Sequence, residues 1–151
     1  VTGVQTCALP ICERYEGFCQ ALADAGKKVD SSLCLTTPLG IDTYREEIDT
    51  FLSSLSRMPD AFVCASDYVA CILMQLLEKR GLRVPEDVAV SGFDNNTEDL
   101  LAEHLTTVQV FNEELGARLA LQILYRIKYP NTPHEITYLG TNVLYRDSTG
   151  D

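Results

Sequence analysis

The chain contains four stretches in which apolar residues recur every three or four positions, the spacing of an amphipathic helix. These stretches cover residues 13–25, 43–55, 68–79 and 112–128. The spacing therefore predicts four helices, each with an apolar face available for packing. In the last helix the face predicted to meet a core consists of Leu115, Leu119, Ile123 and Ile127.

Short apolar runs separate these helices and lack their period. The runs at 61–65 and 88–91 are short enough to be strands buried on both faces. Further strands are predicted at 29–35 and 106–110, and 135–145 is predicted to form one bent strand or two. Helices that alternate with strands indicate an α/β fold, with a parallel sheet flanked by helices.

Three of the predicted helices begin with residues typical of N-caps. Thr43 and Glu46 have the spacing of a capping box. Ser66 and Asp67 can both accept hydrogen bonds from the free N–H groups of the helix that follows them, and Asn112 can do the same. These signals predict where the helices start.

Composition limits the class of protein. With 151 residues, 46% of them apolar, the chain fits one globular unit. Its 12 basic and 22 acidic residues give a net charge of −10, the wrong sign for neutralising phosphates, so this chain alone is not expected to bind DNA. No apolar run reaches the roughly 20 residues of a membrane span, and a cytoplasmic location is expected.

Residues that could bind a metal or form disulfides do not form a recognisable site. None of the six cysteines forms a C-x-x-C pair, and we expect unpaired structural thiols, with Cys64 and Cys71 in apolar runs. His104 and His134 lack partners at metal-ligand or triad spacing, and no phosphate-binding glycine loop occurs. The sequence therefore predicts no metal and no cofactor.

Residues 1–11 carry no charge and no helical or strand period. They resemble the in-frame translation of a common sequencing-adapter oligonucleotide, whose last unpaired T would begin the codon of Cys12. We therefore expect this segment to be non-native and to lie outside the fold, which would begin at residue 12. The alternative is a genuine extended leader.

Several motifs occur in an order that resembles the effector domain of LacI/GalR-type bacterial transcription regulators. They are Arg14-x-x-Gly17-Phe18-x-x-Ala21-Leu22, Ala65-Ser66-Asp67, the stretch from Gly81 to Asp94, Leu105-Thr106-Thr107-Val108 and Glu114-Leu115-Gly116. Each motif alone is weak, but together they are specific. The resemblance covers residues 14–149.

This resemblance implies a particular domain organisation. Residues 12–151 would be the C-terminal subdomain of a type I periplasmic-binding-protein-like fold. Residues 111–129 would form a helix that crosses toward an N-terminal subdomain. Both that subdomain and the helix-turn-helix that binds DNA in this family would be absent from the chain.

The resemblance also implies a ligand site. Arg14 matches the arginine that binds the effector, and a guanidinium group can donate to hydroxyls or a carboxylate. Asp94 follows the strand at 88–91 and matches the aspartate that accepts from ligand hydroxyls. The alternatives are a surface arginine paired with an acid, and an aspartate that serves a turn or forms an ion pair with Arg14.

Four further positions could line the same pocket. Ser66 stands where the family often has asparagine, so its contact would reach less far, and Val110 replaces a polar contact of some members. Phe93 and Phe111 flank the expected cleft as possible pocket walls, although packing in the interior is an alternative for both.

These inferences predict the ligand-sensing and dimerising part of a transcriptional regulator, a repressor that binds a small sugar-like effector. DNA would be contacted only through the missing N-terminal domain, and the apolar helix 68–79, including Cys71, would contribute to a homodimer. Two other interpretations stay open. One is a sugar-binding protein of a transport system, and the other is a doubly wound enzyme that uses Asp94 as nucleophile or base.

Overall fold

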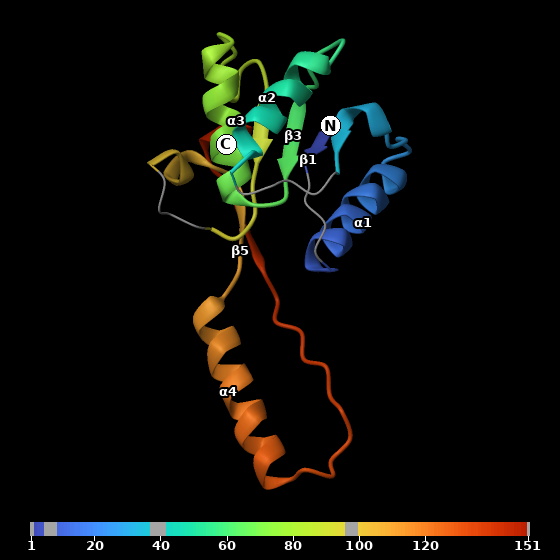
Figure 1. Ribbon diagram of the computed structural model, residues 1–151, viewed down its shortest axis with the longest axis vertical. Helices are drawn as coiled ribbons and strands as arrows, with labels where there is room; N and C mark the ends of the chain where they lie inside the picture. Colours follow the sequence, from blue (N-terminus) through green and yellow to red (C-terminus); the bar gives the residue numbers. More distant parts are fainter. Residues whose placement is uncertain (1, 5–8, 37–41, 96–99, 151) are drawn as a thin grey trace.

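A parallel sheet of four short strands forms the centre of the protein (Figure 1). The computed structural model describes residues 2–4, 9–36, 42–95 and 100–150. The strand order is β2-β1-β3-β4, and every neighbouring pair is parallel. The strands are β1 (Thr2–Val4), β2 (Cys34–Leu35), β3 (Ala61–Cys64) and β4 (Ala89–Ser91). The expected parallel α/β fold is confirmed.

The N-terminal segment takes part in this sheet. β1 lies between β2 and β3, and residues 9–11 form the first turn of the helix α1 (Leu9–Asp24). This arrangement differs from our expectation that residues 1–11 lie outside the fold, since β1 pairs with β2 and β3. Because pairing between strands uses backbone groups, a segment without a side-chain period can still occupy a free place in a ladder. The origin of the segment stays a prediction.

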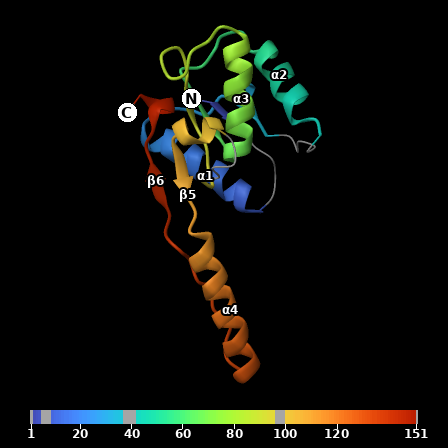
Figure 2. The same cartoon turned by 90° about the vertical axis from the view of Figure 1, so that its left-hand side faces the viewer.

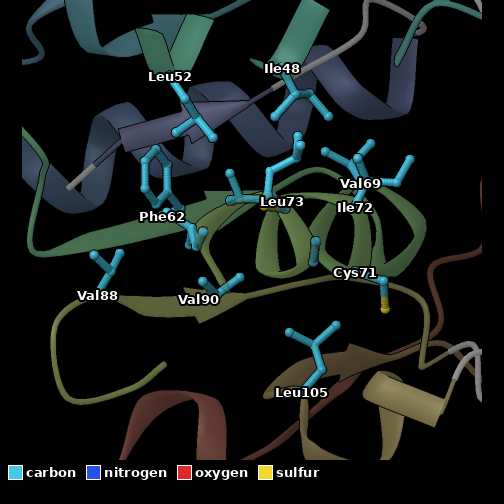
Figure 3. Packing of buried hydrophobic residues seen from close by; sticks show 14 of the residues in the cluster. Ile48, Leu52, Phe62, Val69, Cys71, Ile72, Leu73, Val88, Val90 and Leu105 are labelled. Carbon is cyan, nitrogen blue, oxygen red and sulfur yellow. The ribbon is translucent and has the colours of Figure 1, made fainter. Parts of the chain in front are cut away.

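Two helices and two strands enclose the hydrophobic core. In α2 (Tyr44–Ser54) the buried residues are Ile48, Phe51 and Leu52, as the apolar stripe predicted. Helix α3 (Asp67–Lys79) packs against α2 and against β3 and β4, and most of its apolar residues are buried. Figure 3 shows Ile48, Phe62, Leu73 and Val90 converging from these elements, with Leu105 added from a segment that follows β4.

A second, two-stranded sheet lies beside β4. Strands β5 (Thr107–Gln109) and β6 (Asn142–Leu144) pair antiparallel. Isolated bridges from Ser91 to Thr106 and from Asp94 to Gln109 continue the parallel sheet into β5. The short helices η2 (Leu100–His104) and η3 (Asp147–Thr149) flank this junction.

The C-terminal part of the chain projects away from this body (Figures 1 and 2). Helix α4 (Asn112–Lys128) leaves β5, and residues 129–141 run back beside it to β6. α4 has no buried residue. Its predicted apolar face is exposed among the described residues, at 49% for Leu115, 59% for Leu119, 52% for Ile123 and 72% for Ile127.

Several local predictions are corrected by competing hydrogen bonds. Within the predicted strand 29–35, Asp30 caps the short helix η1 (Ser31–Leu33) by accepting from the Ser32 N–H at 3.0 Å, so only β2 forms a strand. Thr43 makes no capping bond to the backbone of α2, and its hydroxyl donates to Glu47 instead. The N-cap of α4 is Phe111, not Asn112, and only 142–144 of the predicted strands at 135–145 are extended.

The cysteine prediction agrees with the structure where it is described. Cys64 and Cys71 are each 3% exposed and belong to the core, and the described cysteines form no disulfide. Burial raises the pKa of the Cys64 thiol. Within the described ranges, no helix is long and apolar enough to cross a membrane.

Candidate functional site

Asp94 lies just beyond the carboxyl end of β4, at the point where the parallel sheet continues into β5. Its backbone N–H donates to the carbonyl oxygen of Val108 at 2.9 Å. Its φ angle is 109°, and that of Asn95 is 54°, a region that residues other than glycine rarely adopt. Such strained positions concentrate at functional sites.

Arg14, from the N-terminal half of α1, reaches across to this loop. Its Nη1 donates to the Ala65 carbonyl oxygen at 2.7 Å, and its Nη2 lies 3.7 Å from Asp94 Oδ1. The two side chains retain 28% and 43% exposure. The carbonyl of Ala65, at the end of β3, therefore fixes one edge of the guanidinium beside the carboxylate of Asp94.

Phe93 completes this cluster. The Cζ atom of Arg14 lies 3.6 Å from the centre of the Phe93 ring, which is the geometry of a cation–π contact. Phe93 is half-buried rather than part of the core. Its ring thus supports the guanidinium from one face, so the expected pocket wall touches the expected ligand-binding arginine.

The surroundings of Asp94 favour its uncharged form. Burial raises the pKa of this carboxyl above its ordinary value, the positive charge of Arg14 opposes the rise, and the nearby Asp67 carboxylate adds to it. The carboxylate is therefore incompletely neutralised by the protein. A ligand hydroxyl that donated to Asp94 would supply a missing partner.

Ser66 has a structural role in the free chain. It is the N-cap residue of α3, and its hydroxyl oxygen accepts from the Val69 N–H at 3.4 Å. This confirms the capping prediction for Ser66. Among the described residues no hydrogen bond joins Ser66 to Arg14 or Asp94.

Val110 and Phe111 connect β5 to α4. Val110 directly follows Gln109, the residue that pairs with Asp94, and its carbonyl accepts from the Asn112 N–H at 3.1 Å. Both residues are half-buried, and no contact that the structure describes joins either of them to Arg14. They lie next to the cluster, at the base of the projecting arm that consists of α4 and residues 129–141.

Sequence reasoning missed two parts of this region. The backbone carbonyl of Ala65 has no sequence signal, because any residue offers the same group. The second is a buried pair: Thr107 donates from Oγ1 to Asp67 Oδ1 at 2.6 Å. Thr107 belongs to a motif that marked the family resemblance, but that motif alone did not indicate its partner.

Metal binding finds no support in the described residues, among which no group of three His, Cys, Asp or Glu could hold an ion. The site instead consists of a few side chains that can donate or accept hydrogen bonds. Arg14 donates, Asp94 accepts and Phe93 offers an aromatic face, a combination suited to a polar, uncharged small molecule.

Comparison with known proteins assigns the chain to a family. A family model described as a periplasmic binding protein-like domain matches residues 6–149. The chain belongs to this family. Its LacI/GalR resemblance is confirmed by a solved LacI-type transcription regulator from Bifidobacterium animalis subsp. lactis, with TM-score 0.78 and 26% identity over 89% of this chain and 49% of that one.

A regulator named CelR provides two further matches. The HTH-type transcriptional regulator CelR of Thermobifida fusca is 34% identical over 142 residues, which cover 90% of this chain and 40% of that protein. A solved CelR–cellobiose complex has TM-score 0.87 and 29% identity, covering 97% of this chain and 46% of that one. The chain thus spans less than half the length of these relatives, and they are transcriptional regulators, not enzymes.

Proposed function

We propose that this chain is the C-terminal, ligand-sensing half of a LacI/GalR-type regulator, and that its effector is a small sugar-like molecule. The observation that carries the proposal is the contact of Arg14 with both Asp94 and Phe93 at the carboxyl ends of parallel strands. Ligands of open parallel sheets bind at that edge. The match to a CelR–cellobiose complex over 97% of the chain supports a sugar as effector.

The chemistry of the cluster fits a hydroxyl-rich ligand. Arg14 carries five N–H donors, of which the Ala65 carbonyl engages Nη1. Asp94 offers carboxylate oxygens, and its raised pKa reflects partial burial without full compensation. Vicinal hydroxyls can accept from the guanidinium and donate to the carboxylate at the same time. Ser66 would add a third polar contact, while Val110 and Phe111 would form an apolar wall.

We further propose that the arm crosses toward a second subdomain, as the family resemblance implies. α4 exposes an apolar face, and the projecting segment is part of the match to the longer CelR structure. Two subdomains would then enclose the effector from opposite sides. Ligand that favours the closed arrangement would shift the equilibrium between two states of the regulator, and DNA would be bound by a further N-terminal domain in the cytoplasm.

A homodimer would use the exposed side of α3. Cys71 is in the core and cannot contribute, contrary to the expectation from sequence. Tyr68 is 56% exposed. Met74 lines a groove of about 380 Å³ whose other lining residues are the apolar Leu82, Val84 and Leu101 and the charged Glu78, Arg83 and Glu86. A monomeric regulator at micromolar concentration, seen by sedimentation, would contradict this part of the proposal.

The proposal is tested by calorimetric titration of the chain with a panel of mono- and disaccharides that includes cellobiose. We expect affinity in the millimolar range for at least one sugar, since only one wall of the site is present. Asp94→Asn should abolish the heat of binding. Asp87→Asn is the matched control, because Asp87 also pairs with an arginine, Arg83 at 3.0 Å, and precedes β4, whereas the cluster lies beyond the carboxyl end of β4.

Two results would contradict the proposal. If no sugar of the panel produces a binding heat, the sugar-like effector is wrong. If Asp94→Asn and Asp87→Asn bind a sugar equally well, the effector does not use the cluster around Arg14.

A further inference from the structure

A buried carboxylate lies directly behind the strained loop that carries Asp94. Asp67, the first residue of α3, is 2% exposed, and its backbone N–H donates to the Phe93 carbonyl at 2.8 Å. Its carboxylate packs against Gly92, where a Cβ atom would overlap Oδ1 of Asp67. The start of α3 and the loop 92–95 are therefore in direct contact.

Thr107 joins these two parts through its side chain. It is 1% exposed, and its hydroxyl donates to Asp67 Oδ1 at 2.6 Å. The oxygen of the Thr107 hydroxyl also accepts from the Asn95 N–H at 3.3 Å. The direction of both bonds is fixed. The Asn95 amide N–H can only donate, so the Thr107 oxygen accepts there and its one hydroxyl proton is left for the Asp67 carboxyl group.

Two hydrogen bonds to β5 hold the backbone at Asp94 and Asn95. The N–H of Asp94 donates to Val108, and that of Asn95 donates to the Thr107 hydroxyl. Both residues have positive φ, at 109° and 54°. Such conformations persist only where surrounding contacts determine them. One of the two bonds depends on a side chain, and that side chain is oriented by Asp67.

We propose that Thr107 is a positioning residue whose hydroxyl, oriented by Asp67, holds the Asp94–Asn95 backbone in place and so sets the Asp94 carboxylate beside Arg14. The relay runs from Asp67 through Thr107 to Asn95, and it acts on the ligand only through Asp94. Its role in effector binding rests on the proposed function. Its role in fixing the loop does not.

Two substitutions separate positioning from packing. Thr107→Val keeps the size and β-branching of threonine but removes the hydroxyl, whereas Thr107→Ser keeps the hydroxyl. Amide hydrogen exchange is measured at Asp94 and Asn95, and at Leu73 and Leu77 in α3 as reporters of overall opening. NMR titration of the Asp94 carboxyl in each variant measures its pKa, which a change in packing alone would leave unchanged.

In Thr107→Val we expect protection at Asn95 and Asp94 to fall about tenfold more than at Leu73 and Leu77, the scale of one lost hydrogen bond. The Asp94 pKa should move back toward its ordinary value as the loop becomes more solvated. Thr107→Ser should retain both properties. Equal losses at all four amides, or no difference between the two variants, would overturn the proposal.

The unmodified chain offers a measurement that does not require a variant to fold. A hydroxyl proton that is buried and bonded to a carboxylate exchanges slowly, so the Thr107 hydroxyl should give an observable proton resonance of its own. A fast-exchanging Thr107 hydroxyl would overturn the relay.

Sugar binding then separates this inference from the proposed function. Thr107→Val should weaken sugar binding, and Thr107→Ser should retain it. Loss of the relay with unchanged sugar affinity would show that positioning does not serve binding. Unchanged affinity in Asp94→Asn would refute the proposed function and leave the exchange result to judge the relay alone.

Discussion

Substitution of Gly92 by alanine tests how closely α3 must approach the Asp94 loop. A Cβ atom at this position would overlap Asp67 Oδ1 and would lie 2.9 Å from Cδ2 of Leu105 and 3.2 Å from Cα of Asp67. The last of these neighbours is backbone, and both side chains are buried. The methyl group therefore cannot be accommodated by a rotamer change alone.

The expected cost has two parts. Overpacking a well-filled interior costs about 1–3 kcal/mol. Displacing the Asp67 carboxylate also weakens its bond from Thr107, and a hydrogen bond to a charged group contributes about 1.5–3 kcal/mol. The two parts share one carboxylate and are not fully additive, so we expect Gly92→Ala to lower the free energy of unfolding by about 3–5 kcal/mol.

Urea denaturation followed by circular dichroism measures this loss. Gly17→Ala is the matched control, because Gly17 lies within α1 and nothing is found within 4 Å of the added Cβ. Alanine in a helix should raise stability by up to about 1 kcal/mol. If Gly92→Ala unfolds within about 0.5 kcal/mol of the unmodified chain, the close approach inferred here does not hold.

Three further predictions concern charge, core and arm. The raised pKa of Asp94 means that folding favours its uncharged form. The resulting contribution to the free energy of unfolding is full below the ordinary pKa of 3.8 and is lost as the pH rises through the pKa of the folded state. At a pH above the folded pKa of Asp94, Asp94→Asn should therefore unfold at a higher urea concentration than the unmodified chain. Below pH 3.8 the two should unfold at the same urea concentration. A variant less stable than the unmodified chain at neutral pH would contradict this direction. Leu73→Ala should cost about 2–5 kcal/mol in the same assay, because Leu73 is fully buried, and a loss below 1 kcal/mol would contradict its place in the core. Leu119→Gln should change stability by less than about 0.5 kcal/mol, since Leu119 is 59% exposed, and a large loss would show that α4 packs within the chain.

The sequence predicted the helices and central strands well because burial and periodicity agree there. In α2, the stripe containing Ile48, Phe51 and Leu52 is buried as its spacing indicates. The run 88–91 forms β4 because it is short, apolar and bounded by a turn. In α4 the same rule predicted the helix and its apolar face, but amphipathic spacing does not say on which part of a protein the partner of that face lies.

The candidate site was only partly predictable. Arg14 and Asp94 could be named from the family motifs, and the structure brings them within 3.7 Å of each other. Local hydrogen-bonding residues were harder, because Asp30 and Thr43 can each bond to several nearby groups with similar energy. The contact between Thr107 and Asp67 joins residues 40 positions apart, and no local pattern encodes it.

The location of ligand-induced chemical-shift changes shows whether a sugar binds at the cluster of Arg14, Phe93 and Asp94. The labelled chain is titrated with cellobiose and the other sugars of the panel, and amide shifts are mapped onto the structure. The account predicts weak binding, with changes concentrated at Arg14, Phe93 and Asp94. Sugar-induced changes that instead centre on the groove between α4 and residues 133–135, with the Arg14 and Asp94 amides unmoved, would contradict it.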